Sequence, residues 1–317
     1  MEFGGFQSVF RTWNARGVTL VLGAGALDRA IVAASHETGH VSLADSDAVR
    51  LNESVATLTD LGHTVEAFLV DRIDAGSFEH LASVAVRLGQ LRSAVYASAV
   101  PASVAVPASV AVQDVLHGTS CGAALCIDRC APRLSPGGSL VALACAKAYQ
   151  AGINADDEAA LGHVPPSELL DLPFVHPDRF PDAGCAYRTA QRGVQMPVRA
   201  TASQQAAARW QINSVTVGNR AACHPLTAVD EGHRVGPSAT DVAAAVTFLL
   251  GESSSGVCGS ALLVAAASRR LTLADDDDRI DHCNCVNTPA IQPLCYRDSL
   301  ADRRADLMQH HAEHLSY

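Results

Sequence analysis

The stretch that decides the fold is Val18-Thr-Leu-Val-Leu22, an apolar run that leads at once into Gly23-Ala24-Gly25-Ala26-Leu27-Asp28. The apolar run predicts a buried strand, and the glycines after it predict a tight turn. Residues Arg29 to Thr38 are typical of a helix, and Val41–Ala44 predicts a second strand, which ends in Asp45. A strand, a glycine turn, a helix and a strand ending in an acid make the βαβ order of a dinucleotide site.

Strands and helices continue to alternate along the chain. Further strands are expected at Val65–Val70, Ala94–Ala97, Ser139–Ala144, Ile212–Val217 and Ala261–Ala265. Helices are expected at Asp47–Leu61, Ser77–Leu88, Val115–Leu134, Gly184–Ala208 (disturbed at Pro197) and Thr240–Leu250, with Tyr149–Ala183 irregular. Alternation implies a parallel sheet covered on both faces, and right-handed crossovers make it doubly wound. The expected fold class is therefore α/β, a Rossmann-type doubly wound sheet.

The domain organisation expected is one Rossmann-type domain at 1–269 with an insertion at about 148–184, and a polar extension at 270–317. The extension opens with the acidic run Asp275–Asp278 and is rich in His and Cys. A six-residue repeat, Pro101-Ala-Ser-Val-Ala-Val and again from Pro107, is too short for a solenoid and predicts a loop near the carboxyl ends of the strands.

Composition excludes several classes of function. The net charge of −10 argues against binding to nucleic acid or to an anionic membrane surface. No apolar run approaches the roughly 20 residues of a membrane span, and Met1–Arg16 does not resemble a signal peptide, so a cytoplasmic protein is expected. The 10 cysteines lack paired C-x-x-C spacing and are expected to be buried. His310 and His314 would share a helix face but match no zinc motif, so we expect no metal site and favour a mobile or partner-docking tail.

The order of these segments resembles the short-chain dehydrogenase/reductase family over residues 17–265. Seven short stretches, each weak alone, stand in order where that family has motifs: Leu22-Gly23-Ala24-Gly25, Val70-Asp71, Val95-Tyr96-Ala97-Ser98-Ala99, Gly137-Gly138-Ser139-Leu140-Val141, Ala186-Tyr187-Arg188-Thr189-Ala190-Gln191, Ile212-Asn213-Ser214-Val215-Thr216-Val217-Gly218, and Phe248-Leu249-Leu250 with Val257-Cys258-Gly259. The long segment after Cys145, with His224-Pro225-Leu226 downstream, is similar to the hydroxysteroid dehydrogenase/carbonyl reductase branch, which acts on bulky apolar alcohols and ketones.

The resemblance implies a set of cofactor contacts: Gly23, Gly25, Asp28, Asp45, Asp71, Ala97, Gln191, Val217 and Gly218. The turn is one residue shorter than in the family, and Asp28 stands where the last glycine would be. A carboxylate beside a diphosphate is repulsive, by about 1 kcal/mol in water and about 4 at an effective dielectric near 20. Alternatively, Asp28 caps the helix. Asp45 can accept hydrogen bonds from a ribose diol and would repel a 2′-phosphate, which favours NAD over NADP.

The catalytic positions implied by the resemblance are eroded. Where the family has Asn, Ser, Tyr and Lys, this chain has Thr119, Cys145, Tyr187 and Gln191. Tyr187 can give a proton to a carbonyl, and the protonated form needed for reduction prevails at neutral pH because a free tyrosine has a pKa of about 10. Gln191 can bond the ribose but lacks the positive charge of lysine. Cys145 is either a weak polarising donor, a small buried residue or a nucleophile, and Thr119 is a poorer donor than Asn.

The function expected is NAD(H)-linked reduction of a bulky apolar carbonyl compound, of the kind found in specialised metabolism. Two alternatives stay open: an enzyme that catalyses a non-redox step such as cyclisation, dehydration or isomerisation, and a non-catalytic subunit. Family members form dimers or tetramers through the helices that correspond to residues 115–134 and 184–208. The resemblance therefore implies a homodimer or homotetramer, or a hetero-oligomer with an intact relative.

Overall fold

The computed structural model describes residues 17–35, 39–72, 74–97, 110–204, 209–218 and 237–265. Within them the strands form a seven-stranded sheet in the order β3-β2-β1-β4-β5-β6-β7, and every neighbouring pair is parallel. The strands are β1 (Gly17–Leu22), β2 (His40–Asp45), β3 (Thr64–Leu69), β4 (Gln90–Tyr96), β5 (Ser139–Cys145), β6 (Gln211–Val217) and β7 (Ala261–Val264). The predicted doubly wound parallel sheet is confirmed.

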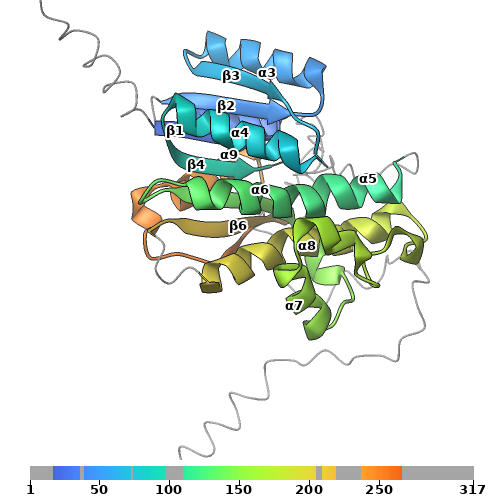
Figure 1. Cartoon of the computed structure of the whole chain (residues 1–317). Helices are drawn as coiled ribbons and strands as arrows, with labels where there is room; N and C mark the ends of the chain where they lie inside the picture. The colour runs from blue at the N-terminus through green and yellow to red at the C-terminus, as the bar shows by residue number, and fades with distance from the viewer. Residues whose placement is uncertain are drawn as a thin grey trace, which may run out of the picture. The chain divides into compact units, whose positions relative to one another are not determined.

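Helices cover both faces of the sheet (Figure 1). One face carries α4 (Ala75–Leu88), α6 (Gly122–Cys130) and α8 (Ala183–Gln204), and the other carries α2 (Ala26–Ala34), α3 (Ala48–Asp60) and α9 (Ala239–Leu250). Because crossovers bury both faces, β1 and β5 are largely apolar runs, and β5 is buried at every residue. This arrangement brings the carboxyl ends of all seven strands to one edge of the sheet.

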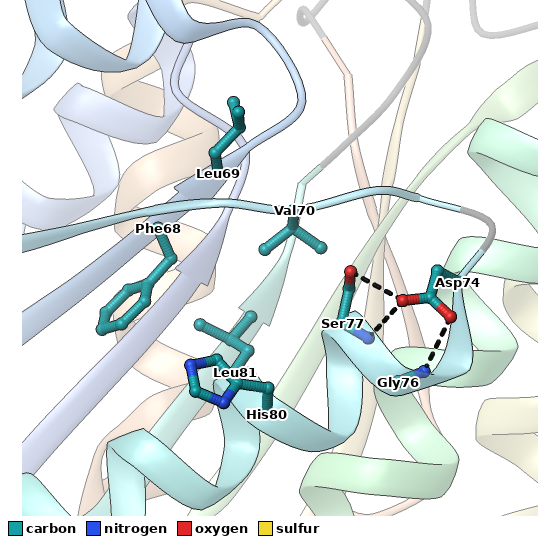
Figure 2. Close-up of a pocket in the computed structure, with 8 residues that line it drawn as sticks. All are labelled: Phe68, Leu69, Val70, Asp74, Gly76, Ser77, His80 and Leu81. Carbon is teal, nitrogen blue, oxygen red and sulfur yellow. Dashed lines mark hydrogen bonds between the residues drawn. The ribbon is translucent and has the colours of Figure 1, made fainter.

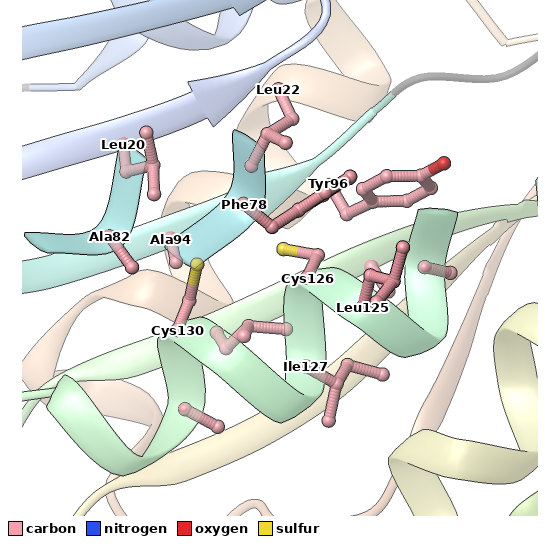
Figure 3. Close-up of a cluster of buried hydrophobic side chains, with 14 of the residues drawn as sticks. Leu20, Leu22, Phe78, Ala82, Ala94, Tyr96, Leu125, Cys126, Ile127 and Cys130 are labelled. Atoms are coloured by element: carbon pink, nitrogen blue, oxygen red, sulfur yellow. The ribbon is translucent and has the colours of Figure 1, made fainter. Parts of the chain in front are cut away.

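Small side chains allow the helices to lie close to the sheet. Figure 3 shows Phe78 and Ala82 of α4 and Cys126 and Cys130 of α6 packed around Leu20 and its neighbours on the strands. A hydrogen bond with Cys130 raises the pKa of the Cys126 thiol well above its usual range, and burial adds to this effect. Such thiols are inert packing residues. The prediction that cysteines act as small buried residues is confirmed for this pair.

Carboxylates fix where two of the helices begin. Asp47 accepts hydrogen bonds from the amides of Val49 and Arg50, which starts α3, and Asp74 starts α4 in the same way.

Asp74 also borders a cavity of about 270 Å³ between β3 and α4 (Figure 2). The cavity is lined by Phe68, Leu69, Val70, Asp74, Gly76, Ser77, His80 and Leu81. None of the residues expected to bind cofactor or to catalyse lines it.

Three expectations need correction. Helix α2 begins three residues before Arg29, so that Asp28 lies inside its first turn. The stretch Tyr149–Ala183 is not wholly irregular, since it contains α7 (Ala155–His163) and short 3-10 turns. Asn154 and Asp157 cap α7 reciprocally, but the helix buries only Leu161, so the sequence shows no apolar stripe. Helix α8 runs through Pro197 without interruption.

Several predictions fall on residues outside the described ranges. These are the polar extension at 270–317, the last residues of the helices expected to reach Thr38 and Ala208, the stretch Ser98-Ala99, the repeat as far as Ser109, and His224-Pro225-Leu226. The second copy of the repeat ends at Val112, the first residue of α5 (Val112–Leu116). Among the described helices, none combines the length and apolar character that crossing a bilayer requires.

Candidate functional site

The strand order reverses between β1 and β4, and ligands of such sheets bind at the carboxyl ends of the strands where this occurs. Gly23 follows β1 and donates to the Ala44 carbonyl at 2.8 Å, while Ala97 follows β4 and donates to the Leu22 carbonyl at 2.8 Å. Gly23 has a φ of +134°, and a Cβ there would lie 2.8 Å from an Asp28 carboxylate oxygen. Glycine is therefore required at the turn, as the sequence predicts.

Asp28 reaches back over this turn from α2. Its Oδ2 accepts a hydrogen bond of 2.6 Å from the Gly25 amide, whereas its Oδ1 is buried and has no partner among the described residues. Burial raises the pKa of Asp28 to about 7; the Gly25 amide opposes this rise and the charge of Asp45 adds to it. The alternative role expected for Asp28, a cap at the start of the helix, is what the hydrogen bond supplies.

Asp45 ends β2 directly beside the turn. It accepts hydrogen bonds from the amides of Ala24 and Asp47, both at 2.9 Å, and from Arg50 at 2.7 and 3.1 Å. Arg72 adds a fifth hydrogen bond, at 3.2 Å. Burial alone would raise the pKa of Asp45, but the hydrogen bonds from Arg50 and Asp47 and the charges of both arginines lower it. Asp45 is therefore an ionised carboxylate.

The sequence analysis missed Arg50 and Arg72. Arg50 lies in the first turn of α3 and Arg72 lies just beyond β3, so that both reach Asp45 from neighbouring strand ends. The only sequence signal was that each follows an acid expected at a strand end: Arg50 comes five residues after Asp45, and Arg72 comes directly after Asp71. The sequence analysis treated Asp45 as an acid without a cation beside it, whereas in the structure Asp45 forms ion pairs with both arginines.

These residues fit the two ends of a dinucleotide differently. Asp45 offers an acceptor of the kind that binds a ribose 2′-hydroxyl, and Arg50 and Arg72 offer cations of the kind that accommodate a 2′-phosphate. The diphosphate position at the N-terminus of α2 is different, because the Asp28 carboxyl covers it and holds the Gly25 amide. The site therefore fits a nicotinamide dinucleotide only when Asp28 carries no charge.

Three of the predicted catalytic residues meet at the carboxyl end of β5. The Gln191 side chain of α8 accepts a hydrogen bond of 2.7 Å from the Cys145 amide through Oε1. Its Nε2 is buried without a partner among the described residues. Tyr187, one helical turn earlier, is 1% exposed and shares an apolar cluster with Cys145. Gln191 thus fixes the face of α8 that carries Tyr187 against the end of β5.

Thr119 lies in a π-helical turn. The expected helix Val115–Leu134 consists of α5, the π-helix His117–Cys121, and α6. The π-turn packs against α8, where the Ser120 hydroxyl donates to the Ala190 carbonyl at 3.0 Å. Thr119 Oγ1 is buried and lacks a partner among the described residues. Since π-turns and unpaired buried polar atoms concentrate at functional sites, Thr119 remains a candidate.

Tyr96 was another residue that the sequence analysis did not single out. Its hydroxyl donates to the Gly118 carbonyl inside the π-turn at 2.7 Å. A Cβ at Gly122 would overlap that hydroxyl. The pairing of a large residue on β4 with a glycine on α6 therefore sets the position of the π-turn.

We expect Gly122→Ala to lower the free energy of unfolding by about 1–3 kcal/mol, the usual cost of overpacking a core. In a Tyr96→Phe background the same change should cost less, because the hydroxyl that the new methyl group meets is gone. Gly256→Ala is the control, because a Cβ there meets nothing within 4 Å. Urea denaturation of the variants measures the differences, and a Gly122→Ala protein as stable as the wild type would disprove this packing.

Arg192 of α8 contacts residues of the insertion and of its own helix. Its guanidinium donates to Glu158 on α7 at 2.7 Å and to the Gln195 side chain at 2.7 Å, and it lies over the Tyr149 ring. These contacts tie α7 to α8 and so hold part of the insertion in place.

Lys147 is a further residue that the sequence analysis missed. It is the only lysine in the chain, and it follows Cys145 by two residues in the short 3-10 helix Ala146–Gln150, which packs against α8. It is half-buried, and its amine makes no hydrogen bond or ion pair with the described part of the chain. The signal that could have found it was composition, since one lysine among 23 basic residues stands beside the site.

The remaining predicted residues lie at the same edge of the sheet. Val217 ends β6 opposite Cys145, and Gly218 donates to the Val264 carbonyl at 2.8 Å. Asp71 is exposed and follows β3. In the insertion, the Nδ1 of His163 lies 2.8 Å from the Ala159 carbonyl of its own helix.

No protein-family model and no curated protein matches the chain. Solved structures do match. A short chain dehydrogenase from Mycobacterium smegmatis is 21% identical with a TM-score of 0.58, over 81% of this chain and 94% of that one. A putative short-chain dehydrogenase/reductase from Burkholderia xenovorans is 23% identical with a TM-score of 0.57, over 80% of this chain and 96% of that one. Levodione reductase is 19% identical with a TM-score of 0.58, over 79% and 96%.

Proposed function

We propose that this chain, which has the fold of the short-chain dehydrogenases/reductases, is an oxidoreductase that reduces a bulky apolar carbonyl compound with NAD(H). Tyr187 is the proposed proton donor. The observation that carries the proposal is the hydrogen bond between Gln191 and the Cys145 amide, because it sets the Tyr187 face of α8 at the end of β5.

The chemistry divides between cofactor and chain. The nicotinamide would supply a hydride to the carbonyl carbon. Tyr187 would give its hydroxyl proton to the carbonyl oxygen, and the Cys145 thiol and Thr119 hydroxyl would polarise that oxygen weakly. The apolar residues around Tyr187, among them Leu116 and Val115, favour an apolar substrate. A carbonyl would thus become an alcohol by the addition of one hydride and one proton.

Asp45 supports NAD(H) as the cofactor, as the sequence predicts. Arg50 and Arg72 favour NADP(H) instead, because both guanidiniums lie beside Asp45 and an arginine near this acid can accommodate a 2′-phosphate. Calorimetric titration with both cofactors at about pH 6 separates the two, since Asp28 is then mostly uncharged.

We expect NADH to bind more tightly than NADPH, and Asp45→Asn to reduce that preference by about tenfold because it removes a charge that repels the 2′-phosphate. Asp47→Asn, a neighbouring carboxylate that does not contact the turn, is the matched control. Tighter binding of NADPH that is lost in Arg72→Gln would reassign the cofactor. Absence of binding by either cofactor at about millimolar concentration would refute the proposed function.

Lys147 is our candidate for the positive charge that Gln191 lacks. Two residues span about 7 Å at most, so the stem of Lys147 begins close to Cys145. A cation near Tyr187 would lower the pKa of its hydroxyl. We expect Lys147→Met to slow alcohol oxidation about tenfold and to move its pH profile upward, while Lys147→Arg preserves both. A pH profile of Lys147→Met identical to that of the wild type would remove this role.

One observation favours the two alternatives left open by the sequence, a non-redox enzyme and a non-catalytic subunit. Because Asp28 covers the diphosphate position, the chain could work without a dinucleotide, either in a non-redox step or as a non-catalytic subunit.

We also propose a homodimer or homotetramer that uses α6 and α8. Light scattering of the purified full chain would measure its mass, and a monomer at micromolar concentration would contradict that assembly.

A further inference from the structure

The N-terminus of helix α2 is occupied by a side chain of the helix itself. First-turn amides and the helix dipole attract negative charge there. The chain places its own carboxyl in this position: Asp28 Oδ2 accepts from the Gly25 amide at 2.6 Å and lies 2.8 Å from where a Cβ on Gly23 would be. The other oxygen, Oδ1, is buried with no partner in the described structure. A buried carboxyl with one unpaired oxygen is costly when ionised.

We propose that Asp28 is a built-in occupant of this anion site, and that a phosphate group binds there only when the Asp28 carboxyl takes up one proton. The neutral carboxyl keeps Oδ2 as the acceptor for Gly25 and turns Oδ1 into an O–H donor. That donor could bond a phosphate oxygen, so protonation would replace a repulsion with a hydrogen bond. This inference rests on the proposed function only in the choice of ligand.

The charges around Asp28 agree with proton uptake near neutrality. From β2, Asp45 faces Asp28 and disfavours its ionised form; from α3, Arg50 favours it, as does Arg29 on α2 itself. Helix α9 packs against α2 through apolar residues, and its one ionisable residue, Asp241, caps α9 at Ser238. Burial outweighs the arginines and brings the pKa of Asp28 to about 7.

The test measures the binding of NAD⁺ and of P1,P2-dimethyl diphosphate by the full chain at about pH 6 and about pH 8. Neither ligand has a phosphate that titrates in this range, so a change in affinity reports the protein. With a pKa of about 7, the affinity of the wild type should fall about tenfold between these pH values. Calorimetry in two buffers of different ionisation enthalpy should show close to one proton taken up per ligand at the higher pH.

Asp28→Asn is the decisive variant, because the amide keeps the acceptor for Gly25 and never ionises. It should bind with the same affinity at both pH values and about tenfold more tightly than the wild type at the higher one. Asp74→Asn makes the same change at the start of α4 and should leave the pH dependence of the wild type intact.

The outcomes separate the proton-dependent phosphate site at Asp28 from the proposed dinucleotide function. Equal pH dependence in the wild type and Asp28→Asn would overturn the proposal, and so would failure of Asp28→Asn to bind either ligand. Proton-linked binding of dimethyl diphosphate without binding of NAD⁺ would sustain the anion site and refute the dinucleotide function. Proton-linked binding of both would support the two together.

Discussion

Asp28→Asn should raise the free energy of unfolding by about 4 kcal/mol at pH values above 8 and leave it nearly unchanged near pH 4, because the pKa of Asp28 rises from 3.8 to about 7 on folding. Between pH 3.8 and about 7 the folded chain binds more protons than the unfolded chain, so the stability of the wild type falls as the pH rises. The whole loss of stability is present once Asp28 is ionised in both the folded and the unfolded state. The asparagine side chain stays neutral, so the variant does not lose this stability.

Urea denaturation of both proteins at about pH 4, 6 and 8 measures this effect. The stability difference should grow steadily with pH and level off above the folded pKa. Asp74→Asn is a control of opposite sign: its hydrogen bonds with Gly76 and Ser77 lower the pKa of Asp74, so this change should destabilise the chain at neutral pH and matter less in acid. A stability gain in Asp28→Asn that is the same at every pH would show that Asp28 does not titrate as described.

Tyr187→Phe should lower the rate of carbonyl reduction by a factor of about 10² to 10⁴, the usual contribution of a positioned general acid. Dinucleotide affinity should not change, because Phe preserves the buried ring in the cluster with Cys145 and loses only the hydroxyl. The effect should therefore appear in kcat, and not in the binding of cofactor. Single-turnover oxidation of NADH at saturating ketone measures it.

Tyr149→Phe is the matched control. Tyr149 is exposed, and the guanidinium of Arg192 lies over the face of its ring, which Phe would preserve. It should leave turnover within about twofold of the wild type, as expected for a surface substitution away from the reacting atoms. Retention of full activity in Tyr187→Phe would transfer the proton-donor role to another group, with Cys145 and Thr119 the first to be tested.

The fold was predictable because its signal is repeated along the chain. Buried parallel strands must be apolar on both faces, so β1 and β5 stand out as largely apolar runs between helical segments. Helix α7 was missed because it buries one side chain and so lacks an apolar stripe. The start of α2 was misplaced because its cap, Gly25, has no side chain to signal it.

The candidate site was only partly predictable, because its electrostatics depend on contacts between distant segments. The positions of Gly23, Asp45, Cys145 and Tyr187 follow from their places at strand ends and on one helix face. The pairing of Asp45 with Arg72 joins residues 27 apart in sequence, and no local pattern announces it. The raised pKa of Asp28 likewise follows from burial, which a sequence shows only indirectly.

The most direct measurement is a crystal structure of the full-length Asp28→Asn variant with NADH. It would give the distance from nicotinamide C4 to the Tyr187 hydroxyl. Hydride transfer to a carbonyl carbon and proton transfer to its oxygen together require these atoms to lie about 4 to 6 Å apart. We predict that distance, with the diphosphate at the N-terminus of α2. A dinucleotide bound elsewhere, or a nicotinamide ring far from Tyr187, would contradict the proposed reductase.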